Sequence, residues 1–266
     1  MLTQWKLGEQ LGKGLYWAWD RKEDDQRLQP SDIFLTAEWR DLAMLNYEVN
    51  PDLLRKLVPS GTELDSWNGK TFLSLVGFRF IKTKVWSISV PFHSNFDEVN
   101  LRFYVRRLEG AEVKRGVVFI REIVPRRLIA ALARIFYNEP YVALPMSHAI
   151  RSDVTALDVE YGWKHGPSTN KIRATAKGTP LHPENGSLEQ FIAEHYWGYT
   201  AQKDGGCIEY QVQHPPWKVW PAADAMFEGD MQKLYGADLD TVLKNPPQSA
   251  FLAEGSAVTV HRGRRL

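Results

Sequence analysis

The chain has 266 residues, of which 44% are apolar and 12% aromatic, which is enough to bury a core in one large domain or two small ones. Its 33 basic and 32 acidic residues nearly cancel, and no basic block stands out, so nothing favours nucleic-acid binding. The single cysteine, Cys207, excludes an internal disulfide framework, and neither a membrane span nor the apolar core of a secretory signal is evident. We therefore expect a soluble cytoplasmic protein that contacts neither nucleic acid nor membrane, and the sequence leaves homo-oligomerisation open.

The chain divides into a predicted N-terminal extension, residues 1–32, and a predicted single domain, residues 33–266. In that domain, apolar alternation or continuous apolar runs predict strands over 34–39, 42–49, 71–81, 97–107, 116–124, 153–163, 171–177, 208–213 and 257–261. Helices are predicted over 52–58 after Asn50, over 125–136, from Ser187 onward and over roughly 222–243. Many short strands with few helices predict a mainly β (α+β) fold, with a closed or nearly closed antiparallel sheet.

The predicted strand over 97–107 alternates between an apolar and a polar face. The polar face carries Glu98, Asn100, Arg102, Tyr104 and Arg106. A solvated outer face explains this pattern, and so does the wall of an internal cavity. The mixture of carboxylate, amide, guanidinium and phenol favours the cavity, because the planar fork of a guanidinium suits a carboxylate or phosphate ligand.

Two charged residues, Arg121 and Glu122, interrupt the apolar run of the strand over 116–124. Adjacent residues on a strand face opposite sides, so one of the two side chains must point inward. A buried charge without a partner is costly. A structural salt bridge is one explanation, and a cavity-lining group with a perturbed pKa is the other.

Common catalytic and metal-binding motifs are missing from the sequence. The seven histidines do not occur at metal-ligand spacing, and Cys207 has no cysteine partner. No GxSxG elbow and no glycine-rich phosphate loop occurs either. We therefore expect no metal and no cofactor. The turn His214-Pro215-Pro216-Trp217 is rigid and carries an aromatic side chain, which suits a lid or plug of the sheet.

Several segments carry a family resemblance, and they occur in the order FLTAEWRDLAMLNYEVNPDLLRKLVPSGTELDSWNGKTFLSLVGFRF, VPFHSNFDEVNLRFYVRR, RGVVFIREIVPRRLIAALARIFYNEPYVALPMSH, HPPW and FLAEGSAVTVHRGRRL. Together they resemble the uncharacterised DUF2071 (YqjF-like) family, over roughly residues 33–266. The resemblance implies membership of the acetoacetate decarboxylase-like superfamily. It therefore implies a large antiparallel β-barrel or cone around a central cavity, with a few flanking helices.

The resemblance also bears on the chemistry of the turn that follows the helix predicted over 125–136. Acetoacetate decarboxylases carry two adjacent lysines there; the first forms a Schiff base and the second lowers its pKa. In this sequence Tyr141 and Val142 stand at those positions, and no lysine occurs between Lys114 and Lys164. The resemblance thus implies a decarboxylase-like cavity without Schiff-base chemistry in this turn.

The candidate site combines these observations. Candidate catalytic residues are the bases Glu98 and Glu122, which resemble the cavity carboxylates of the superfamily, and the acids Tyr141 and His148. Candidate ligand-binding residues are Asn100, Arg102, Tyr104, Arg121 and Tyr137.

Three functions remain open at this point. The first is a protein that binds a small organic acid or carbonyl compound. The second is a lyase, isomerase or hydrolase that acts on such a compound without a Schiff base. The third is a structural or interaction protein whose aromatic N-terminal arm, residues 1–32, docks a partner.

Overall fold

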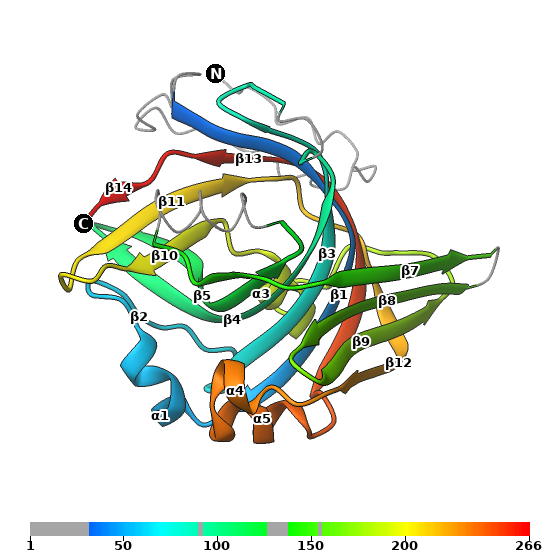
Figure 1. The fold of residues 1–266 in the computed structure, drawn as a ribbon. Coiled ribbons are helices and arrows are strands. Elements are labelled where there is room, and N and C mark those ends of the chain that lie inside the picture. The colour runs from blue at the N-terminus through cyan, green and yellow to red at the C-terminus, as the bar shows by residue number, and fades with distance from the viewer. Residues whose placement is uncertain (1–31, 90–92, 127–137, 154–155) are drawn as a thin grey trace, which may run out of the picture. The chain divides into compact units, whose positions relative to one another are not determined.

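The computed structural model describes residues 32–89, 93–126, 138–153 and 156–266. From Ile33 onward the described chain consists mainly of strands (Figure 1), as the sequence predicts. The helices of this part are short, and none has the length and apolar character that crossing a bilayer requires. The predicted extension lies almost entirely outside the described residues, so the division near residue 32 stays a prediction.

The strands and helices follow one another in a simple order. The strands are β1 (Ile33–Val49), β2 (Glu63–Leu64), β3 (Thr71–Val85), β4 (Phe96–Glu109), β5 (Glu112–Val124), β6 (Tyr141–Ala143), β7 (Met146–Ser152), β8 (Ala156–His165), β9 (Ser168–Lys177), β10 (Trp197–Ala201), β11 (Cys207–Gln213), β12 (Val219–Glu228), β13 (Ser249–His261) and β14 (Arg264–Arg265). The helices are α1 (Pro51–Leu54) with a 3-10 turn η2 (Arg55–Leu57), α3 (Leu188–Ala193), α4 (Gln232–Tyr235) and α5 (Ala237–Leu243).

The central strands close into a ring. Its order is β11-β10-β5-β4-β3-β1-β13, and β13 pairs with β11 to complete it. Beyond the ring, β12, β9, β8 and β7 continue the sheet from β13 as an arm (Figure 1). Most pairs are antiparallel as predicted, but β10 and the short β6 both run parallel to β5. A parallel pair needs a long crossover, and the chain between β5 and β10 includes β7, β8, β9 and α3.

The strand β1 joins two segments that the sequence predicts as separate strands. Asp41 lies between them with a positive φ of 55°, and the pairing register with β3 shifts between Arg40 and Ala43. Asp41 accepts a hydrogen bond from Arg79 Nε at 2.9 Å, which holds the irregularity in place. A bulge of this kind bends a strand and lets it follow the curve of a ring.

Local signals of the sequence are confirmed at turns and helix starts. The turn after Trp67 has positive φ at Asn68 (49°) and Gly69 (78°), as a two-residue hairpin loop requires. Asn50 caps α1 by accepting a hydrogen bond from Asp52 N at 3.0 Å. Ser187 caps α3 in the same way, from Gln190 N at 3.1 Å.

The helix α3 packs against the inward faces of two ring strands. The ring of Phe191 lies 5.3 Å from Tyr104 of β4 and 6.4 Å from Phe72 of β3, measured between centroids. These residues belong to one buried apolar cluster together with Leu188 and Ile192. The helix therefore brings the residues at its C-terminal end next to β4.

One prediction is wrong and another cannot be followed. The helix predicted over 222–243 is correct only for α4 and α5, because residues 219–228 form β12. Pairing of β12 with β9 overrides the helical propensity of its alanines. The helix predicted over 125–136 falls almost wholly on residues outside the described part of the chain. The sequence also did not predict β7 and β10, nor the very short β2, β6 and β14.

Candidate active site

A cavity of about 150 Å³ lies within the ring of strands. Its lining side chains come from all seven ring strands and from the segments around α3 and the turn after β11. One water molecule needs roughly 10–15 Å³ of such space, so the cavity has room for a small organic molecule the size of about ten to fifteen waters. Aromatic side chains form much of its apolar wall, and they include Trp39, Phe78, Phe80, Phe96 and Trp217.

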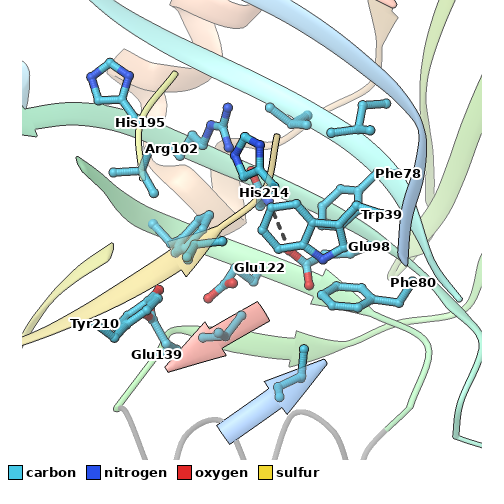
Figure 2. A pocket seen from close by; sticks show the side chains of 18 of the residues that line it. Trp39, Phe78, Phe80, Glu98, Arg102, Glu122, Glu139, His195, Tyr210 and His214 are labelled. Atoms are coloured by element: carbon cyan, nitrogen blue, oxygen red, sulfur yellow. Dashed lines mark hydrogen bonds between the residues drawn. The ribbon is translucent and has the colours of Figure 1, made fainter. Parts of the chain in front are cut away.

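Three glutamates meet on the polar part of the wall (Figure 2). Glu98 belongs to β4, Glu122 to β5, and Glu139 immediately precedes Pro140 and the short strand β6. Each is buried, with exposed fractions of 2%, 2% and 5%. The pairing of β4 with β5 and of β5 with β6 brings them together although they are distant in sequence.

Neutral hydrogen-bond donors surround two of these carboxyls. Glu98 accepts hydrogen bonds from Tyr141 Oη and Asn100 Nδ2, both at 3.0 Å. Glu139 accepts them from Thr200 Oγ1 at 2.5 Å and Tyr210 Oη at 2.8 Å. None of these donors carries a positive charge. The cluster is therefore held by neutral donors rather than by the salt bridge that the sequence left open for Glu122.

Burial controls the protonation of the cluster. It raises the pKa of Glu98 to about 7, against the lowering effect of the hydrogen bonds from Asn100 and Tyr141. Burial likewise raises the pKa of Glu139 to about 7. The pKa of Glu122 lies well above its ordinary value, because of burial first and then the nearby charges of Glu139 and Glu98. At neutral pH the cluster therefore holds protons that it can exchange.

Another part of the wall carries a cation. Arg102 of β4 is 9% exposed, and its Nη2 lies 3.5 Å from the carbonyl oxygen of Ile192 in α3. Its Nε has no hydrogen-bond partner among the described residues. His195, two residues beyond α3, lines the cavity as well (Figure 2). Both contact the ring of Tyr104: Arg102 Cζ lies 5.8 Å from its centroid, and the centroid of the His195 ring lies 4.7 Å from it.

The rigid turn after β11 contributes the aromatic pair His214 and Trp217. Their rings stack with centroids 4.1 Å apart, and Trp39 lies 6.1 Å from Trp217. His214 Nδ1 donates a hydrogen bond to the carbonyl oxygen of Pro215 at 2.9 Å, since that oxygen can only accept. Burial lowers the pKa of His214 to about 4, so the ring is neutral. The turn thus forms part of the cavity wall.

Five of the predicted site residues lie together on the cavity wall: Glu98, Asn100, Arg102, Glu122 and Tyr141. The first three follow at every second position of β4, and their apolar neighbours face the opposite side into a separate core cluster. The polar face of this strand therefore lines the cavity and is not a solvated outer face.

Three predicted residues lie elsewhere, and a fourth cannot be placed. Tyr104 faces inward but is covered by Phe191 and His195, so it does not line the cavity, and its hydroxyl is 2.6 Å from Ser74 Oγ. Arg121 faces away from Glu122, and its Nη2 donates to the carbonyl oxygen of Leu234 at 3.3 Å. His148 belongs to β7, outside the ring, with Nδ1 2.9 Å from the Asp97 carboxylate. Tyr137 lies outside the described residues.

The sequence interpretation missed part of the wall. Glu139 and His195 were not selected, and neither was Trp39. Glu139 stands two residues before Tyr141, so its position beside the turn was a usable signal. His195 follows an apolar helix and has no motif around it. Within the described residues, no group of three or more His, Cys, Asp or Glu side chains is arranged to hold a metal ion.

Solved structures with a similar fold belong to acetoacetate decarboxylase-like enzymes. One is acetoacetate decarboxylase from Legionella pneumophila, with a TM-score of 0.63 and 14% identity over 88% of this chain and 87% of that one. A second is the enduracididine biosynthesis enzyme MppR in complex with pyruvate, with a TM-score of 0.63 and 12% identity over 91% and 93%. A third is an acetoacetate decarboxylase-like enzyme from Sphingomonas wittichii, with a TM-score of 0.60 and 12% identity over 90% of this chain and 94% of that one. At these identities the likeness shows the fold.

Sequence comparison gives a closer relation. The uncharacterized protein YqjF of Bacillus subtilis is 29% identical over 191 residues, which are 71% of this chain and 76% of that protein. The DUF2071 family, described as an uncharacterized conserved protein, matches residues 36–257. That match spans most of the ring and its cavity wall, and the chain therefore belongs to the DUF2071 family.

Proposed function

We propose that this chain binds a small organic acid or carbonyl compound in the cavity of the ring, with Arg102 pairing to the oxyanion of the ligand. One observation carries the proposal. Four buried polar atoms on the same wall have no hydrogen-bond partner among the described residues: Asn100 Oδ1, Arg102 Nε, Glu122 Oε2 and His195 Nδ1. Buried polar groups are paired in the great majority of folded proteins, so a set of unpartnered polar atoms on residues that line one cavity favours a ligand that supplies the partners.

The composition of the wall supports a small, partly apolar ligand. The aromatic surface around Trp39 accommodates a hydrocarbon part, and the guanidinium of Arg102 offers a planar fork for a carboxylate. No lysine occurs among the described residues of the wall, nor in the sequence between Lys114 and Lys164. The proposal therefore assigns no covalent imine to this site, and the ligand is held by charge, hydrogen bonds and apolar contact.

A second candidate function is proton transfer on the same class of compound, as a lyase, isomerase or hydrolase performs it. The pKa of about 7 at Glu98 and Glu139 favours it, because a general acid or base works best near the ambient pH. In this candidate the Glu98 carboxylate takes a proton from the ligand, and the charge left on the ligand pairs with Arg102. Tyr141, which donates to Glu98, orients that carboxylate.

A thermal-shift screen tests the first proposal. The purified chain is measured against small carboxylic, keto and phosphorylated acids at high concentration. A ligand at about 100 times its dissociation constant adds about 2.7 kcal/mol of stability. For a domain of this size that corresponds to a rise in Tm of roughly 5–10 °C.

The matched variants are Arg102→Ala and Arg106→Ala. Both arginines lie on β4, but Arg106 is exposed and pairs with Glu63 at 2.7 Å. We expect the shift to vanish in the first variant and to persist in the second. A ligand-induced shift that survives Arg102→Ala would exclude the assigned role of this arginine. For hits, turnover measured in wild type and in Glu98→Gln then separates the enzyme from the binding protein.

A further inference from the structure

The side chain of His195 is held in one orientation at the cavity wall. Its ring lies 4.7 Å from Tyr104 and 5.0 Å from Phe191, between centroids, and only 1% of the side chain is exposed. Its Nε2 lies 3.4 Å from Oδ2 of Asp65, whose side chain is completely buried. The two aromatic rings and this carboxylate leave one polar edge of the imidazole, Nδ1, without a contact to a polar group in the described chain.

The surroundings of Asp65 identify it as an ionised acceptor. Arg115 Nε lies 2.9 Å from Oδ2, and Ser66 N donates to Oδ1 at 2.9 Å. Burial alone would raise the pKa of Asp65, but the hydrogen bond from His195 and the charge of Arg115 keep it below its ordinary value. A carboxylate accepts and cannot donate, so the proton of the imidazole is on Nε2. Nδ1 consequently presents a lone pair.

Two cations lie near enough to His195 to act on its charge, Arg102 and Arg115. Arg102 contacts the same Tyr104 ring, and its Nη2 reaches the carbonyl oxygen of Ile192, three residues before His195. Arg115 approaches from the side of Asp65. Burial and these two positive charges lower the pKa of His195, against the opposing effect of Asp65. The cavity wall therefore combines a cationic donor with an uncharged acceptor.

We propose that this pair selects hydroxy acids: Arg102 binds the carboxylate, and His195 Nδ1 accepts a hydrogen bond from a hydroxyl group on a neighbouring carbon. Asp65 acts as a positioning residue that fixes the tautomer. The inference rests on the function proposed above and names its ligand class. The corresponding keto acid has no proton to give at that position, so its carbonyl oxygen would face the Nδ1 lone pair. A buried acceptor left without a donor lowers affinity by roughly 10- to 100-fold.

The first measurement needs no variant. Nitrogen chemical shifts of ¹⁵N-labelled protein distinguish the protonated nitrogen of each imidazole from the unprotonated one. We expect His195 to carry its proton on Nε2. His214 serves as the reference in the same spectrum, because its Nδ1 donates to Pro215. A His195 ring with the proton on Nδ1, or with both nitrogens protonated at neutral pH, would overturn the inference.

The second measurement compares matched ligand pairs with the same carbon skeleton. The probes are lactate against pyruvate and 3-hydroxybutyrate against acetoacetate, each titrated by calorimetry. For at least one pair we expect wild type to bind the hydroxy acid roughly 10- to 100-fold more tightly. We expect Asp65→Asn to abolish or invert that ratio, because the amide it introduces donates to Nε2 and moves the proton to Nδ1. The spectrum of the variant must show the same change of tautomer.

The outcomes separate this inference from the function on which it rests. If the acids bind with dependence on Arg102 but every hydroxy-to-keto ratio in wild type is near one, the selection of hydroxy acids is wrong and the binding function stands. If Asp65→Asn folds and keeps the ratio, Asp65 does not position the acceptor. If no acid binds to wild type in the calorimeter or the thermal screen, the proposed function itself fails.

Discussion

The hydroxyl of Tyr141 donates a 3.0 Å hydrogen bond to the carboxyl of Glu98. Tyr141 stands in the turn where the family resemblance implies that lysines are replaced, and Glu98 lies on the central strand β4. The turn therefore reaches the cavity, and Tyr141 supplies a phenol there. Its effect on the site is to orient a carboxyl group and to tune its acidity.

Replacing Glu98 by Gln should change how stability depends on pH. The pKa of Glu98 is about 7 in the folded chain and 4.5 for an unperturbed glutamate, so the unfolded chain loses this proton first as the pH rises. The stabilisation of the folded chain by this bound proton is complete below about pH 4.5, declines as the pH rises, and is lost above about pH 7. It amounts to about 3 kcal/mol, since one pKa unit corresponds to about 1.4 kcal/mol.

Urea unfolding at about pH 5 and about pH 8 measures this decline. We expect Glu98→Gln to have a smaller decline than wild type, with the remainder due to Glu122 and Glu139. The exposed Glu112→Gln serves as the control and should behave as wild type does. An equal decline in Glu98→Gln and wild type would contradict the assignment of the proton to this carboxyl.

Replacing Tyr141 by Phe should make Glu98 a weaker acid. The hydrogen bond from Tyr141 lowers the pKa of Glu98, so its loss leaves the effect of burial less opposed. Carboxyl ¹³C shifts followed over pH measure the midpoint, and we expect it to rise. The loss of one hydrogen bond in the interior costs about 1 kcal/mol of stability. An unchanged midpoint would show that the phenol does not act on this carboxyl in solution.

Replacing Glu209 by Gln should lower the free energy of unfolding more than the loss of any exposed ion pair does. Its side chain is fully buried, with Arg264 Nη2 at 2.7 Å from Oε1 and Arg107 Nη1 at 3.2 Å from Oε2. Lys114, itself buried, lies 3.5 Å away. Removing the negative charge leaves these cations less compensated, at a cost of roughly 3–5 kcal/mol.

The matched control for this substitution is Glu63→Gln. Glu63 is half exposed and pairs with Arg106, so its loss should cost at most about 1 kcal/mol. Chemical unfolding of both variants gives the comparison. Hydrogen exchange should also show faster opening of β11 and β14, which Glu209 and Arg264 join. Equal costs for the two variants would contradict a structural role of the buried cluster.

Replacing Gly198 by Ala should displace Tyr210, a residue of the cavity wall, and destabilise the chain. A Cβ atom at this position would lie 2.1 Å from Cζ of Tyr210, whose hydroxyl binds Glu139. The ring must move, and overpacking of this kind costs roughly 1–3 kcal/mol. In the control Gly162→Ala the nearest atom is the Ser147 hydroxyl at 3.1 Å, so a lower cost is expected. Thermal unfolding of the two variants provides the test.

The sequence predicts much of the fold because local signals and alternation agree. Asn50, Ser187 and the turn after Trp67 mark element ends through groups that act within a few residues. The alternation of β4 gives the correct face for Glu98 and Arg102. Closure of the sheet was predicted from the number of short strands, and the family resemblance implied it as well. The parallel pair β5–β10 had no signal, because nothing in either strand specifies a partner so far along the chain.

The site was harder to predict because its members come from different strands. Charged residues within apolar runs, such as Glu122, have a signal of their own, since burial of a charge needs an explanation. His195 and Asp65 have none: one follows an ordinary amphipathic helix and the other precedes a hairpin turn. Only the placement of α3 against β4 makes them neighbours. His148 shows the converse, because the sequence made it a candidate acid and yet β7 lies outside the ring.

The pairing of β1 with β13 has a consequence for the synthesis of the protein. Ile33 lies opposite His261 and Met44 opposite Phe251. During synthesis β1 therefore emerges from the ribosome long before β13, the strand with which it pairs. Until β13 is available, the edge of β1 that does not pair with β3 is unpaired, and such edges can pair with other chains. Contacts so distant in sequence also slow folding. The cavity therefore forms only after translation has passed β13, which makes a chaperone or a low synthesis rate favourable to the yield of folded protein.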